Sequence, residues 1–101
     1  MGFYPPFKNV QNVIVGGEIL DKLERLRYLR VLYQLNQTEI GRSIGTSRNY
    51  ISQVENAKLQ ISKEQYNKLI NAIYRIGEAK KKGLLDQALE DIKKELELNK
   101  N

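Results

Sequence analysis

Apolar residues and glycines recur at fixed offsets across residues 37–55, and this spacing constrains the fold more than any other feature of the chain. Ile40 and Ile44 lie four residues apart, so one face of a helix presents both to a core. Gly41 stands on the same helix, where a neighbouring element crosses closely. Gly45 follows where the chain must turn sharply, and glycine adopts positive φ at little energetic cost. The pattern predicts a short helix that ends in a tight turn.

A second short helix is predicted directly after this turn. Ser47 is placed to cap it, and Ile51 and Val54, three residues apart, are its inward anchors. Two short helices that meet at a steep angle over a shared core make a helix-turn-helix. The inward anchors leave polar side chains on the outer face, with Tyr50 beside them: Arg48, Asn49, Ser52 and Gln53.

These outer side chains have the chemistry to read the edges of DNA bases. Arginine pairs with guanine, asparagine and glutamine pair with adenine, and serine accepts several partners. In a helix-turn-helix, the second helix enters the major groove. Alternatively, the same residues form only a solvated polar face. Their place on the surface that should meet DNA favours base reading by Arg48, Asn49, Tyr50, Ser52 and Gln53.

The stretch resembles the Cro/CI-type helix-turn-helix family of bacterial and phage regulators, also called the XRE family. The usual run in that family is Q-x-x-L-A-x-x-x-G-V-S-x-x-x-I-S-x-x-E-x-G. The corresponding positions here are Gln37, Ile40, Gly41, Gly45, Thr46, Ser47, Ile51, Ser52, Glu55 and Ala57. The resemblance extends over about residues 26–73, roughly half the chain, and implies a lambda-repressor-like, all-α domain.

Three positions depart from the family's run. Gly41 replaces the usual alanine, which loosens the first helix by up to ~1 kcal/mol. Thr46 stands where an apolar residue is commoner. Ala57 replaces the glycine after the second helix, and alanine resists positive φ. None of the three lies on the predicted reading face.

The resemblance also implies roles outside the reading face. It implies contacts to DNA phosphates, which fix register without reading sequence, from Asn36, Gln37, Arg42, Ser47 and Lys58. Asn36 and Gln37 open the first helix of the motif, whose free amides and positive dipole end favour phosphate. Arg30 and Glu55 match positions that form an internal ion pair in related domains, so the expected role of Arg30 is structural.

The rest of the chain is predicted to be helical apart from its N-terminus, which gives an all-α fold of about five helices. Residues 1–17 form a predicted extended arm with three aromatic residues, two prolines and a final Gly16-Gly17 pair. This arm either packs on the body or is exchanged between two subunits. Apolar spacings of three and four predict a helix over residues 18–35, and Ser62 with Gln65 fits a capping box that opens another. The helix-turn-helix domain is expected to span residues 18–77.

An additional C-terminal amphipathic helix is predicted after a break marked by Gly77, the lysines at 80–82 and Gly83. Over about residues 84–98, apolar residues spaced by four, three and four form a seam of Leu85, Leu89, Ile92 and Leu96. Two heptads are short for a coiled coil, which needs roughly three to four. Residues 78–101 are therefore expected either to pack on the body or to form a dimer contact.

Composition narrows the classes of function. The chain has no cysteine and no histidine, which removes thiolate metal sites and the commonest general base, so neither a metal nor a cofactor is expected. Asp86, Glu90 and Asp91 alternate with lysines on a helix face that reads as solvated, so an enzyme is not expected. No run of about 18 apolar residues exists to span a membrane, and the N-terminus lacks a secretory pattern. The expected location is the cytoplasm.

The charge distribution indicates an anionic partner. The net charge is +5, and residues 78–101 are neutral, with six lysines against six acidic residues, so the excess lies in residues 1–77. Double-stranded DNA is the expected partner, bound by a homodimer that represses transcription at a palindromic operator. The alternative is an antitoxin or another regulatory interaction protein, which would bind a protein partner through the arm or the C-terminal helix.

Overall fold

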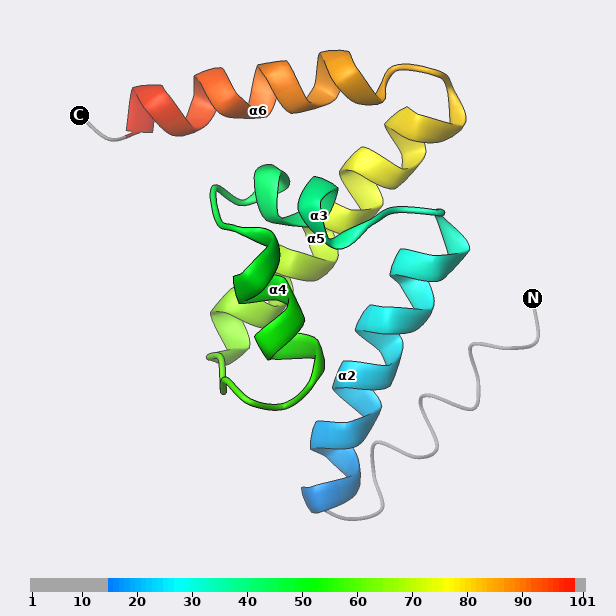
Figure 1. The fold of residues 1–101 in the computed structure, drawn as a ribbon, viewed down its shortest axis with the longest axis vertical. Helices are drawn as coiled ribbons and strands as arrows, with labels where there is room; N and C mark the ends of the chain where they lie inside the picture. The colour runs from blue at the N-terminus through cyan, green and yellow to red at the C-terminus, as the bar shows by residue number, and fades with distance from the viewer. Residues whose placement is uncertain (1–14, 100–101) are drawn as a thin grey trace.

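Five α-helices make up the described part of the chain, residues 15–99, in this computed structural model (Figure 1). They are α2 (Val15–Leu32), α3 (Gln37–Ser43), α4 (Arg48–Glu55), α5 (Lys63–Lys81) and α6 (Leu85–Asn99). No strand occurs within this range, and the predicted all-α fold of five helices is confirmed. None of these helices is long and apolar enough to cross a membrane. Residues 1–14, which hold most of the predicted arm, lie outside the described residues, as do residues 100–101.

The helices enclose one apolar core. Figure 1 shows α5 passing behind α3 and α4, with α2 alongside them and α6 across the top. The innermost side chains come from four helices, α2 to α5, and they are Leu26, Leu29, Ile40, Ile51, Val54, Leu69, Ile73 and Ile76. Of the inward residues predicted from spacing, Ile40, Ile51 and Val54 are fully buried in this core, and Ile44 is half-buried against it. The two short helices of the motif are therefore fixed by the same apolar cluster.

Polar side chains fix the first residues of α3 and α5. Oδ1 of Asn36 accepts a hydrogen bond from the backbone N of Glu39 at 2.7 Å, and the backbone N of Asn36 donates to Oε1 of Glu39 at 2.9 Å. Oγ of Ser62 accepts from the backbone N of Gln65 at 3.0 Å, where the sequence predicts a cap. Each cap satisfies an amide that has no partner within its own helix, an effect of about 1 kcal/mol.

Four helices end in the same backbone turn, a Schellman motif that includes one residue of positive φ. These residues are Gln34 (φ 57°), Gly45 (φ 75°), Ala57 (φ 60°) and Gly83 (φ 76°). After α4, for example, the backbone N of Lys58 donates to the carbonyl of Gln53 at 2.9 Å, and that of Ala57 donates to Val54 at 3.1 Å. The left-handed region costs a residue other than glycine about 1–2 kcal/mol, so α2 and α4 end under local strain.

α2 begins and ends three residues earlier than apolar spacing predicts. The predicted range was residues 18–35, whereas the helix runs Val15–Leu32. The Gly16-Gly17 pair, predicted to end the arm, lies in the first turn of the helix. Leu35 follows the turn at the end of α2 and is only 4% exposed, so it fills the core from a loop. An apolar residue that continues the three- and four-residue spacing of a helix can thus be buried while lying beyond the end of that helix.

α5 continues through Gly77 to Lys81, so the predicted break before α6 begins later than the sequence indicated and covers only residues 82–84. Gly77 is buried, and a Cβ at this position would overlap ring atoms of Tyr33, which follows α2. The absence of a side chain at this position allows the segment after α2 to pack closely against α5. The chain leaves α5 only at Gly83, where φ is positive.

α6 lies along α3 and the C-terminal part of α5. Its predicted apolar seam faces the core, with two residues buried and the outer two half-buried: Leu89 and Ile92, then Leu85 and Leu96. Arg75 of α5 donates to both carboxylate oxygens of Glu95 on α6, at 2.7 and 3.0 Å. This hydrogen bonding lowers the pKa of the Glu95 carboxyl and raises the pKa of Arg75. The seam is therefore covered within the chain itself.

Candidate nucleic-acid interface

α4 has one face enclosed by the core and one face open to solvent. Ile51 and Val54 are fully buried, and Glu55 is 2% exposed. Arg48 and Asn49, on the first turn, are exposed, and the remaining candidates for base reading are half-buried: Tyr50, Ser52 and Gln53. The ring of Tyr50 packs against the core at the edge of the open face. One short helix thus presents four polar side chains beside one aromatic ring.

The start of α4 is held closely against α3. Oγ of Ser47 accepts a hydrogen bond from the backbone N of Tyr50 at 3.1 Å and caps the helix. Gly41 of α3 lies beneath the turn, where a Cβ would stand 2.9 Å from the carbonyl oxygens of both Thr46 and Ser47. Cβ atoms essentially never approach backbone that closely, so the crossing of α3 and α4 in this chain requires glycine where the family usually has alanine.

The end of α4 is held by a network around Glu55. Nε of Arg30 donates to Oε2 of Glu55 at 2.7 Å, and Nη2 of Arg30 donates to Oε1 at 3.0 Å. Nε2 of Gln37 donates to the same Oε1 at 3.0 Å. The Glu55 side chain is 3% exposed and that of Arg30 is 22% exposed. The buried carboxylate of Glu55 therefore accepts a bidentate pair of hydrogen bonds from Arg30 of α2 and a third hydrogen bond from Gln37 of α3.

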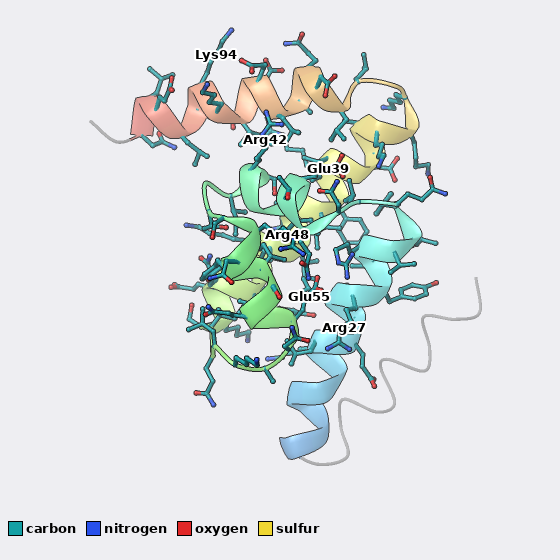
Figure 2. The ribbon with its side chains drawn as sticks, viewed as in Figure 1. Arg27, Glu39, Arg42, Arg48, Glu55 and Lys94 are labelled. Carbon is teal, nitrogen blue, oxygen red and sulfur yellow. The ribbon has the colours of Figure 1, made fainter. Side chains whose placement is uncertain are left out.

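Arg27 adds a contact that the sequence did not indicate. Its guanidinium donates to the backbone carbonyl of Glu55, and Figure 2 shows Arg27 of α2 pointing toward the end of α4. Because Arg27 and Arg30 are one turn apart, α2 holds both the side chain and the main chain of Glu55. The target of Arg27 is a backbone atom, which leaves no signature in the sequence.

Four of the five residues predicted to contact phosphate lie near the ends of α4. Gln37, through its bond to Glu55, adjoins the last turn, and Lys58 follows that turn. Ser47 caps the first turn, and Arg42 lies five residues earlier in the chain, in the last turn of α3. The ends of an eight-residue helix are about 12 Å apart, close to the width of a major groove.

Asn36, the fifth of these residues, caps α3 with its Oδ1, and its side chain is exposed. Glu39 closes the capping box and places a carboxylate at the start of α3, 3.7 Å from Nζ of Lys80. This negative charge opposes the positive helix end that the sequence suggested as a phosphate site. Any phosphate contact here would depend on the side-chain amides of Asn36 and Gln37.

Thr46 leads to a prediction about stability. Its Oγ1 is buried and, among the described residues, has no hydrogen-bond partner. A buried unpaired hydroxyl costs roughly 1–3 kcal/mol, and valine has nearly the same shape without it. Thr46→Val is expected to raise the free energy of unfolding by about 1 kcal/mol, as measured by urea denaturation. A variant less stable than the parent protein would show that the hydroxyl has a partner.

The acidic residues of α6 do not form a metal site. Among the side chains that the structure describes, those of residues 22–99, no group of three or more carboxylates gathers in a way that could hold a metal ion. Asp86, Glu90 and Asp91 are each exposed, and Oδ1 of Asp91 accepts a hydrogen bond from Gln87 at 3.0 Å.

Comparison with known proteins supports the motif assigned from this geometry. A helix-turn-helix family model matches residues 26–73, which run from α2 through the motif helices into α5. No curated protein and no solved structure matched the chain. Residues 26–73 thus form a helix-turn-helix domain of the Cro/CI type, the XRE family of DNA-binding regulators.

Proposed function

We propose that the protein is a sequence-specific repressor whose α4 lies in the major groove of its operator. The supporting observation is the open face of α4. Its polar side chains stand on a helix whose opposite face is fully buried. The start of this helix is capped by Ser47, and its end is bonded to both α2 and α3. A rigid helix holds reading groups at fixed positions, which specific hydrogen bonding to base edges requires.

Base reading is assigned to the open side of α4. Arg48 is the candidate for guanine, because a guanidinium bonds both acceptors on the guanine edge. Within the described residues no carboxylate forms an ion pair with Arg48 that would compete for it. Asn49 and Gln53 suit adenine, Ser52 suits several bases, and the half-buried ring of Tyr50 would contact a neighbouring base.

Phosphate contacts are assigned to the two ends of α4 and, for Asn36, to the start of α3. Ser47 uses its oxygen as an acceptor in the helix cap, so its hydroxyl hydrogen is still available to a phosphate. Asn36 likewise accepts through Oδ1 and keeps its amide hydrogens. Gln37, Arg42 and Lys58 complete this set. Such contacts would fix the register of α4 on the duplex without reading sequence.

We further propose that a homodimer binds a two-fold operator, because one short recognition helix covers only a few base pairs. The covered seam of α6 argues against that helix as the dimer contact, since Leu89 and Ile92 are each 3% exposed within one chain. A dimer would then form through another surface, such as the N-terminal arm. Sedimentation of the protein with its selected duplex measures the stoichiometry, and one chain on an asymmetric site would contradict the dimer.

The test of the proposed function is selection from a pool of random duplexes at a stated salt concentration, because affinity for DNA depends strongly on salt. The parent protein is expected to enrich one motif, and Arg48→Ala/Gln53→Ala should lose that motif while remaining folded. Asn67→Ala/Asn71→Ala is the matched control, since it removes two exposed polar side chains from α5. No enrichment by the folded parent protein would reject sequence-specific binding and direct the search to a protein partner.

A further inference from the structure

An open hollow of about 630 Å³ lies between the α3–α4 turn and the C-terminal half of α6. It is lined by residues from both sides, among them Arg42, Gly45, Thr46, Lys93, Leu96 and Glu97. Gly45 and Thr46 directly precede Ser47, the cap of α4. The hollow therefore adjoins the end of α4 that leads into the proposed DNA interface.

Two cations from different helices line this hollow. Arg42 comes from the last turn of α3 and Lys93 from the middle of α6, and both side chains are exposed. Figure 2 shows Arg42 pointing from α3 toward α6. In the described part of the chain, neither cation forms an ion pair, although Glu97 lines the same hollow. Two cations and one carboxylate line the hollow, which leaves it a net charge of +1 and favours an anionic ligand.

α6 is held firmly where it presents Lys93. One turn further on, a methyl carbon of Leu96 lies 3.1 Å from the place that a Cβ would take at Gly45. On a neighbouring face of α6, Glu95 accepts two hydrogen bonds from Arg75 of α5. Lys93 therefore stands on a helix that packs directly on the turn before α4.

We infer that the hollow is a binding site for a phosphate of the DNA backbone, in which α6 supplies Lys93 beside Arg42 of α3. The inference deepens the proposed function and rests on it. A major groove about 12 Å wide is bounded by phosphates on both sides, so a helix lying in it has phosphates within side-chain reach of its ends. The C-terminal helix is thereby part of the DNA interface as well as a cover for the core.

The experiment measures the salt dependence of binding to the selected duplex and to an unrelated duplex of equal length. One phosphate contact contributes about 0.9 to the slope of log affinity against log salt. Lys93→Gln is expected to reduce the slope by about 0.9 on both duplexes, because a phosphate contact carries no sequence information. Glu97→Gln is expected to strengthen binding to both duplexes, because it removes a negative charge from the hollow.

Lys94→Gln is the matched control. It removes the same charge from the next residue of α6, which is exposed and in Figure 2 extends away from α3. Its slope is expected to stay close to that of the parent protein. Equal slopes for Lys93→Gln and Lys94→Gln would overturn the inference while DNA binding by the parent protein leaves the proposed function intact. A folded parent protein that binds neither duplex would overturn both.

Discussion

Replacing Arg30 with methionine is expected to lower the free energy of unfolding by about 3 kcal/mol. Removing one partner of a buried ion pair costs roughly 3–5 kcal/mol, because the other charge is left without compensation. The lower end applies here, since the Arg30 side chain is 22% exposed and Gln37 still donates to the carboxylate. Native domains are stable by only about 5–15 kcal/mol, so this single change removes a large share of the total.

Arg75→Met is the control for this prediction. Arg75 and Glu95 form a bidentate ion pair of the same geometry, at 2.7 and 3.0 Å, but their side chains are 47% and 52% exposed. An exposed pair contributes about 0–1 kcal/mol, so the control variant should unfold within that range of the parent protein. Both variants are measured by urea denaturation at neutral pH. Equal losses would mean that burial does not set the strength of the Arg30–Glu55 pair.

The double variant Arg30→Met/Glu55→Leu separates the value of the pair from the cost of breaking it. With both charges removed, an apolar pair of similar size is often neutral or stabilising. We expect this variant to recover most of the loss of Arg30→Met. Failure to recover would indicate that the hydrogen bond from Gln37 to the Glu55 carboxylate matters more than the charge, since the bond from Arg27 goes to the main chain and remains in this variant.

The sequence predicted the motif helices well because their determinants are local. The bounds of α4 follow from a cap at Ser47 and inward anchors at Ile51 and Val54, all within eight residues. Gly45 predicted the turn before α4, because positive φ favours glycine. Two other helix ends gave no such signal, since Gln34 and Ala57 take the same conformation against their own preference.

Contacts between distant segments were the part that the sequence could not predict. Arg27 donates to a backbone carbonyl, an acceptor that every residue has, so its partner could not be chosen from the sequence. The Arg30–Glu55 pair was expected only through the family resemblance. One missed feature did carry a local signal, because Asn36 and Glu39 fit the pattern of a capping box.

The contact between Gly77 and Tyr33 shows why a glycine can be misread. In the sequence it resembles a helix break, yet in the structure it leaves room for an aromatic ring. That ring is fixed on several sides. It meets Tyr74 edge-on with centroids 6.0 Å apart, and its hydroxyl donates to Oε2 of Glu78 at 2.7 Å. The donated bond is the main cause that lowers the pKa of the Glu78 carboxyl.

Gly77→Ala is therefore expected to lower the free energy of unfolding by about 2 kcal/mol. Alanine in a helix interior is favoured over glycine by about 1 kcal/mol, but overpacking costs up to about 3 kcal/mol, and here the overlap involves the base of the Tyr33 ring. Displacing the ring should also break its bond to Glu78, so the pKa of that carboxyl should rise toward its usual value. Urea denaturation and carboxyl titration by NMR measure the two effects.

The sign of the stability change should reverse once the ring is gone. In a Tyr33→Ala background a methyl group at position 77 has space, so only the helix preference remains, and Gly77→Ala should then stabilise by about 1 kcal/mol. Stabilisation in both backgrounds would mean that the ring moves aside without cost. Glycine at position 77 would then lower the stability of α5 slightly without being required for the packing of Tyr33 against it.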